Sequence, residues 1–158
     1  MTQANVGLTQ EQVEGVVGLL KAALADEHVL YTKTRNFHWN VTGPQFNDLH
    51  KFFETQYGEL ETIIDEVAEN IRYFGVKSPG SLKEFLETAR LKEAEDGNLT
   101  ARQMLQALVE DHETLVRCLR SGIDAANEQY KSAEIADFFT TLMEQHLKMA
   151  WMLRSMVD

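Results

Sequence analysis

A run without proline from Phe46 to Phe74, FNDLHKFFETQYGELETIIDEVAENIRYF, limits the fold of this chain more than any other segment. Its apolar residues recur with the period of an amphipathic α-helix. The run therefore predicts one long helix with one face packed into a core. The stripe that we expect to pack inward comprises Phe46, Phe53, Tyr57, Leu60, Ile64 and Ile71.

Four potential metal ligands, His50, Glu54, Asp65 and Glu69, share one narrow face of this helix beside the apolar stripe. The two members of each pair, His50/Glu54 and Asp65/Glu69, are about 6 Å apart along the axis, close enough to bind one ion. Glu54 and Asp65 are roughly 16 Å apart, too far for one site on one straight helix. Two antiparallel copies related by a two-fold axis would bring the pairs together twice. The spacing indicates a histidine–carboxylate site at a subunit interface.

A solvated acidic face is the alternative interpretation of the same residues. In that case Lys51 and Arg72 would pair with the carboxylates, and His50 would be one polar residue among others. Two ligand pairs on one face beside the core stripe keep the metal interpretation open alongside it.

Helix-start and helix-stop signals along the chain predict an all-α fold. A short break at Gly43 and Pro44 implies an antiparallel hairpin, which could bring His38 near His50. Two such hairpins joined by a long crossover give a ferritin-like four-helix bundle with a short extra helix in the crossover. We expect a flexible segment at 1–8 and one domain at 9–158. The predicted helices span residues 9 to about 36–38, 46–74, a short stretch from 81, 100 to about 127, and 132–156.

Composition restricts the classes of partner. The formal net charge of −10 opposes binding to nucleic acid and to anionic membranes, and it favours concentration of cations. Cys118 is the single cysteine, which excludes an intrachain disulfide and fits a reducing compartment. There is no membrane-spanning apolar run and no secretory signal, so we expect a cytoplasmic protein, free in the bacterial cytoplasm or associated with the nucleoid.

Di-iron helical bundles usually carry Glu-x-x-His on two helices that point into the core. None of the five histidines has a glutamate three positions before it. We therefore expect no such site inside the bundle, and we expect His112 and His146 to be polar or packing residues.

The segments HWNVTGPQF, DLHKFFE and DEVAE closely resemble the Dps family, the mini-ferritins named DNA-binding proteins from starved cells. The order of helices fits the family over about residues 9–156. The resemblance implies a hollow shell of twelve subunits with ferroxidase activity. Such a protein oxidises Fe(II), with hydrogen peroxide preferred over O2, and stores ferric mineral inside, which protects the cell from oxidative damage.

The resemblance also implies a ligand set for a di-iron or mono-iron site at the two-fold interface, where Zn could substitute for iron. Glu54 stands where many members have Asp, and Asn70 stands where Arg is frequent. The implied ligands are His38, His50 and Glu54 of one subunit with Asp65 and Glu69 of its partner.

Four further residues have two interpretations each. Trp39 resembles the family's tryptophan beside the iron site, where it would intercept radical equivalents, but it could equally be a large core anchor. Asp137, Glu134 and Asp124 resemble the acidic residues of the iron-entry pores at three-fold axes. Their alternative role is that of ordinary surface carboxylates, with Glu134 favourably placed in a first helical turn.

Direct DNA binding is not expected, because family members that bind DNA use mobile Lys/Arg-rich tails and this chain has none. Three functions remain for comparison. The first is an iron-oxidising and iron-storing cage. The second is a metal-buffering or DNA-protecting assembly with negligible catalysis, and the third is a structural helical bundle.

Overall fold

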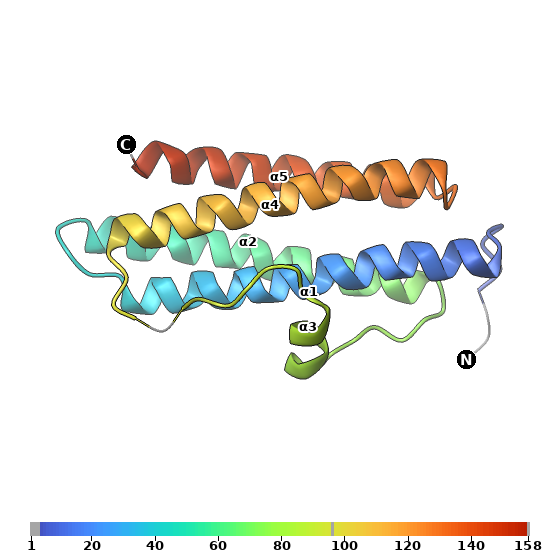
Figure 1. Cartoon of the computed structure of the whole chain (residues 1–158), viewed down its shortest axis with the longest axis horizontal. Helices are drawn as coiled ribbons and strands as arrows, with labels where there is room; N and C mark the ends of the chain where they lie inside the picture. The colour runs from blue at the N-terminus through green and yellow to red at the C-terminus, as the bar shows by residue number, and fades with distance from the viewer. Residues whose placement is uncertain (1–3, 96, 158) are drawn as a thin grey trace.

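The computed structural model of the chain describes residues 4–95 and 97–157. The segment 1–8 lies partly outside these ranges, and its flexibility stays a prediction. Over the described ranges the chain is all-α, as predicted, and forms five helices without strands (Figure 1). They are α1 (Gln10–Asn40), α2 (Phe46–Tyr73), α3 (Leu82–Thr88), α4 (Ala101–Glu128) and α5 (Ala133–Val157).

Local side-chain signals start three of the helices. The Thr9 hydroxyl oxygen accepts the Gln12 N–H, and the Thr9 N–H donates to the Gln12 side chain, which forms a capping box at the start of α1. The same reciprocal arrangement joins Ser81 to Glu84 in α3, and a third one begins α4 at Thr100. Because these signals are local, the sequence was sufficient to place the helix starts.

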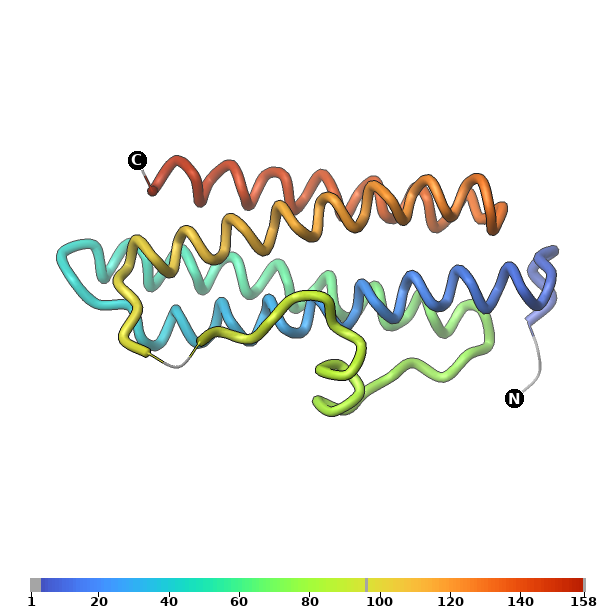
Figure 2. The backbone as a smooth tube through the Cα atoms, in the orientation of Figure 1, coloured from blue at the N-terminus to red at the C-terminus, as the bar shows by residue number. Residues whose placement is uncertain are grey.

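The four long helices form a bundle of two antiparallel hairpins, α1–α2 and α4–α5 (Figure 1). The helices α2 and α4 run in the same direction, so the connection between them returns along the whole bundle. This connection passes over α1 and includes α3 (Figure 2). The topology is the ferritin-like one with a single long crossover.

The crossover is fixed to α1 by one buried carboxylate. Asp26 is fully buried and accepts the backbone N–H groups of Arg90 and Leu91 at 2.6 and 3.0 Å. The Arg90 guanidinium completes the contact, with Nη2 2.7 Å from the carboxylate. Earlier in the crossover, Phe85 of α3 stacks on His28 of α1 at a centroid distance of 3.8 Å.

The buried face of α2 differs from the predicted stripe. Phe53, Leu60 and Ile71 are buried as expected, whereas Phe46 is 45% exposed and Ile64 is only half-buried. The buried residues are spaced by three or four positions, which keeps one face against the other helices. They are Leu49, Phe53, Gln56, Leu60, Ile63, Val67 and Ile71.

Three ionisable side chains meet in the bundle core. His146 Nε2 lies 2.7 Å from Glu27 Oε1, and His146 Nδ1 lies 2.8 Å from His112 Nδ1. All three side chains are fully buried. Both histidines are hydrogen-bonded in the core, and their assignment as polar or packing residues in place of ligands stays a prediction.

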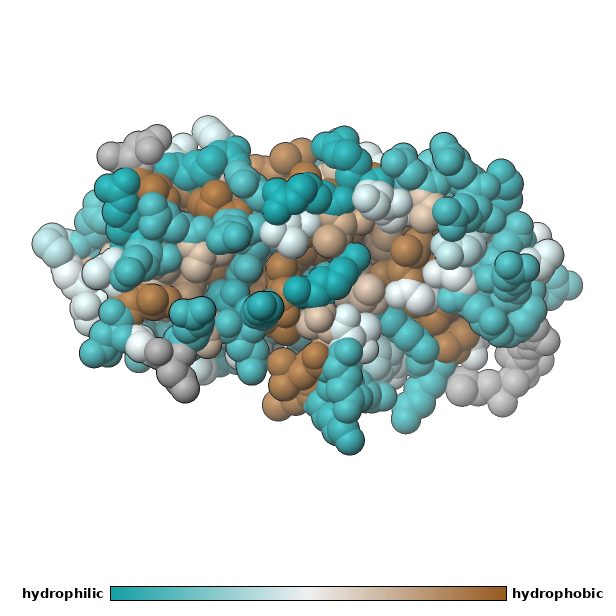
Figure 3. All heavy atoms as spheres, in the orientation of Figure 1, coloured by the Kyte–Doolittle hydropathy of each residue, from teal (hydrophilic) through white to brown (hydrophobic). Residues whose placement is uncertain are grey.

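Hydrophilic residues predominate on the face shown in Figure 3, with apolar patches between the helices and on α3. The α3 patch includes Leu82, which is 73% exposed, and Leu86. None of the described helices is both long enough and apolar enough to cross a membrane.

Candidate metal centre

His38 and His50 face each other across the α1–α2 hairpin, as the short break between these helices predicted. His38 Nδ1 lies 2.7 Å from the His50 carbonyl oxygen, and His50 Nδ1 lies 2.8 Å from the His38 carbonyl oxygen. A carbonyl oxygen only accepts hydrogen bonds, so each Nδ1 carries a proton and donates it. In the neutral ring each Nε2 then has a free lone pair, the state that binds a metal ion.

Backbone hydrogen bonds of this kind are the usual support of metal-binding histidines, because they fix the tautomer and the orientation of the ring. Ring packing adds to this support. The two imidazoles are stacked at 3.8 Å with an interplanar angle of 17°. Phe46 stacks on His50 with ring centroids 5.1 Å apart, and the rings of Tyr57 and His38 pack edge to face with centroids 5.3 Å apart.

The predicted carboxylate ligands lie on the exposed side of α2. Glu54 lies one helical turn after His50, whereas Asp65 and Glu69 lie further along the same helix. Within the described ranges, no three His, Cys, Asp or Glu side chains are grouped so that they could hold a metal ion. One subunit thus brings together His38 and His50, and the five-residue ligand set stays a prediction.

Trp39 lies at the edge of this centre and is 62% exposed, so its interpretation as a buried core anchor is wrong for the subunit. The Arg35 guanidinium carbon lies 4.9 Å from the Trp39 ring, 5.4 Å from the Tyr31 ring and 5.5 Å from the Tyr57 ring. This cluster of Arg35 with three aromatic rings was not predicted from the sequence. The spacing of four between Tyr31, Arg35 and Trp39, which puts them on one face of α1, could have indicated it.

The three candidate pore residues, Asp124, Asp137 and Glu134, are all exposed in the subunit. Glu134 lies in the first turn of α5 and accepts a hydrogen bond from the Ser132 hydroxyl at 2.6 Å. This contact is consistent with a role for Glu134 at the start of the helix. Its role in a pore stays a prediction. The same holds for Asp137 and Asp124.

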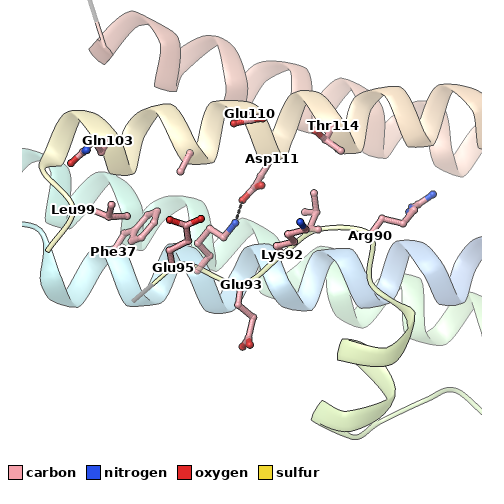
Figure 4. Close-up of a pocket in the computed structure, with 14 residues that line it drawn as sticks. Phe37, Arg90, Lys92, Glu93, Glu95, Leu99, Gln103, Glu110, Asp111 and Thr114 are labelled. Atoms are coloured by element: carbon pink, nitrogen blue, oxygen red, sulfur yellow. Dashed lines mark hydrogen bonds and ion pairs between the residues drawn. The ribbon is translucent and has the colours of Figure 1, made fainter. Parts of the chain in front are cut away.

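A separate cavity of about 550 Å³ lies between α1, α4 and the crossover. Asp111 points from α4 into this space and pairs with the Lys33 amine at 2.6 Å (Figure 4). Burial raises the pKa of Asp111, and the neighbouring Lys33 opposes this shift. None of the predicted metal ligands lines the cavity, so it is distinct from the histidine centre.

Comparison with known proteins agrees with the fold. The ferritin-like domain family matches residues 17–158. The DNA protection during starvation protein 2 of Bacillus anthracis is 40% identical over 146 residues, covering 90% of this chain and 97% of its own length. An uncharacterized low temperature-induced protein of Nostoc sp. is 44% identical over 158 residues, covering 100% of this chain and 88% of its own length.

Among solved structures, the Dps protein from Bacillus brevis superposes with a TM-score of 0.90 at 34% identity, covering 96% of this chain and 100% of its own. Dps from Staphylococcus aureus gives a TM-score of 0.86 at 35% identity, covering 96% and 98%. The fold thus defines a ferritin-like protein. Within that class the chain belongs to the Dps family, as the sequence motifs predicted.

Proposed function

We propose that this protein is a ferroxidase and iron-storage mini-ferritin. It oxidises Fe(II), with hydrogen peroxide as the preferred acceptor and O2 as the slower one, and stores the ferric product in a shell of twelve subunits. Membership of the Dps family supports the general function of iron storage and protection against oxidative stress. A Dps protein of Vibrio cholerae, with a TM-score of 0.91 at 28% identity, is described as a member of a broad superfamily of ferritin-like diiron-carboxylate proteins.

The reciprocal hydrogen bonds of His38 and His50 are the observation that carries this proposal. They hold both imidazoles in the tautomer that donates from Nδ1 and leaves Nε2 for a metal ion, beside a helix face that carries exposed carboxylates. Imidazole and carboxylate together suit Fe(II), and Zn(II) would compete for the same ligands. The substrate iron would be bound by His38, His50 and Glu54, with Asp65 and Glu69 supplied by the partner subunit.

Two Fe(II) ions give one electron each to a hydrogen peroxide molecule, which takes up two protons and becomes two water molecules. The reaction consumes both reagents of Fenton chemistry at one place, which is how it would protect the cell. Carboxylates stabilise the additional charge of Fe(III) and can bridge two ions. The protein's part is to hold the ligands in position, so that the reaction occurs at the centre and not in solution.

The exposed apolar side chains of the subunit support assembly, because apolar patches of this kind are usually covered in an interface. They include Leu82 on α3 and Trp151 on α5, which are 73% and 60% exposed. In the assembled shell, Asp137, Glu134 and Asp124 would line the entry path for iron. The negative charge of the chain opposes direct DNA binding, so protection by this protein would operate through iron and peroxide in the cytoplasm.

The first test is anaerobic loading with Fe(II), addition of hydrogen peroxide, and a sizing column on which protein and ferric absorbance are followed together. We expect ferric iron to travel with a particle of twelve subunits. Retention of iron without oxidation would favour the metal-buffering assembly. A small oligomer with precipitated iron would favour the structural bundle.

The variant His50→Ala tests the centre itself. We expect it to lose rapid oxidation and to keep the shell, whereas Lys51→Ala, which removes the exposed neighbour on α2, should behave as the parent protein. Unchanged oxidation by His50→Ala would refute the assignment of the centre.

A further inference from the structure

Two tyrosines connect the histidine centre with the interior of the α1–α2 hairpin. The Tyr57 ring meets the His38 ring edge-on, with centroids 5.3 Å apart at 82°. Tyr31 meets Tyr57 in the same manner at 6.0 Å and 89°. The rings therefore form a continuous path of close contacts from a candidate iron ligand, His38, through Tyr57 to Tyr31.

The positively charged guanidinium of Arg35 lies beside this path. Arg35 donates from Nη1 to the Tyr31 hydroxyl at 3.0 Å, and its guanidinium carbon lies within 5.5 Å of the centroids of Tyr31, Tyr57 and Trp39. A neighbouring positive charge disfavours oxidation of an indole to a radical cation. It has a smaller effect on a phenol, because a tyrosine loses its proton together with the electron and the radical that remains is neutral. Among the three rings, this arrangement favours oxidation of a tyrosine over that of Trp39.

A phenylalanine at position 57 would pack against His38 as well as the tyrosine does. Tyr57 and Tyr31 are half-buried, and the fully buried positions nearby on α2 carry Phe53 and Leu60. Tyr57 is partly exposed to solvent, and solvent is the acceptor that we assign to its hydroxyl proton. An oxidisable and partly exposed ring thus lies beside a candidate iron ligand.

We propose that Tyr57, with Tyr31 behind it, supplies the second electron when the centre holds a single Fe(II). This inference rests on the proposed ferroxidase function. Hydrogen peroxide needs two electrons and two protons to become two water molecules. One electron comes from Fe(II), while the other comes from Tyr57 together with its hydroxyl proton, and solvent supplies the second proton. The O–O bond breaks without release of a hydroxyl radical, and Tyr57 becomes a neutral tyrosyl radical.

A second Fe(II) then reduces the radical. Tyr57 regains one electron from this ion and one proton from solvent, and the sum of both steps is the ordinary two-iron reaction. The edge contact with Tyr31 offers a second ring that can share the unpaired electron until that iron arrives. In this way a centre that holds one Fe(II) ion instead of two can still reduce hydrogen peroxide to water.

The experiment uses the assembled protein with less Fe(II) than one ion per centre, mixed anaerobically with hydrogen peroxide and frozen at short times for electron paramagnetic resonance. We expect a tyrosyl signal that narrows when the tyrosines are deuterated. Tyr57→Phe keeps the ring that packs against His38 and should lose this signal. With the same variant, a spin trap in solution should capture more hydroxyl radical.

Tyr73→Phe is the matched control, because Tyr73 lies on the same helix, is 62% exposed and lies outside the ring path. Its tyrosyl signal should equal that of the parent protein. A signal that persists in Tyr57→Phe, or one that narrows on deuteration of tryptophan instead, would overturn the inference. Normal ferric formation without any tyrosyl signal would overturn this inference alone, whereas failure to form ferric iron would overturn the proposed function.

Discussion

The Nδ1 atoms of His112 and His146 lie 2.8 Å apart at the centre of the bundle. Two imidazole nitrogens at this distance share one proton, since one nitrogen donates and the other accepts. Burial, and then the charge of the adjacent His146, lower the pKa of His112 well below its ordinary value of 6.5. The native bundle therefore holds His112 in its neutral form.

This contact predicts a loss of stability in mild acid. In the unfolded chain His112 takes up a proton as the pH falls through 6.5, whereas in the native protein it stays neutral until a much lower pH. Its stabilising contribution is complete above 6.5 and declines below that value by at most about 1.4 kcal/mol per pH unit. Urea unfolding between pH 8 and pH 5 measures this decline.

The variant His112→Gln should show a shallower decline, because the titrating group is absent. Some decline will remain, since burial also lowers the pKa of His28 and gives a contribution of the same sign. Identical pH dependence in the variant and the parent protein would exclude His112 as a source of the effect.

The buried carboxylate of Asp26 should be among the most sensitive positions for stability. Asp26→Ala removes the acceptor of two backbone N–H groups and leaves the Arg90 side chain without its partner. We expect a loss of about 3–5 kcal/mol in the free energy of unfolding. The exposed pair Lys83–Glu87 provides the control, and Lys83→Ala should change stability by less than about 1 kcal/mol. Similar losses for the two variants would show that the crossover is not anchored at Asp26.

The positions of the helices could be predicted from the sequence, because the residues that form each start or stop signal lie within a few positions of each other. Capping pairs such as Thr9 with Gln12 lie three residues apart, and the break at Gly43 defined the hairpin that brings His38 to His50. The buried face of α2 was only partly readable. The buried face is turned about the helix axis from the predicted stripe, toward Leu49, Gln56 and Ile63. The neighbouring helices decide which face of a long helix is buried, and the periodicity of the helix alone does not.

Contacts between ionisable residues far apart in the chain could not be predicted from the sequence. Glu27 and His146 are 119 residues apart, and Lys33 and Asp111 are 78 residues apart. Residues of these types are usually exposed, so nothing local marks them as buried partners. The subunit structure likewise places the two histidines of the candidate centre, whereas the carboxylates that we propose from a second copy depend on assembly.

The space around two helical glycines, Gly122 and Gly18, predicts opposite effects for their substitution by alanine. A Cβ atom on Gly122 would lie 2.8 Å from Cε2 of Phe139, which is buried and has little room to move. Gly122→Ala should therefore cost about 1–3 kcal/mol of stability. Gly18 of α1 has open space around its Cβ position, so Gly18→Ala should stabilise the helix by about 0.5–1 kcal/mol. Thermal unfolding of both variants measures these effects, and equal midpoints would contradict the packing at Gly122.

An interface centre makes a further prediction that an intrasubunit centre does not. His50→Ala and Asp65→Asn should each abolish rapid Fe(II) oxidation when every subunit carries the substitution. In a mixed dimer, one interface centre combines both defects, while the other combines an intact His50 with an intact Asp65 from the second copy. Random mixing of equal amounts restores about a quarter of the centres, because half of the dimers are mixed and each contains one intact centre of two.

The measurement is the initial rate of Fe(II) oxidation by hydrogen peroxide after the two variants have been unfolded and refolded together. Separate refolding followed by mixing of the assembled shells is the control, and it should give no recovery because the subunits no longer exchange. Recovery after joint refolding would mean that His50 and Asp65 act from different subunits. Absence of recovery, with shells of normal size, would mean that both residues serve a centre within one subunit. Full activity of Asp65→Asn alone would mean that Asp65 is not a ligand.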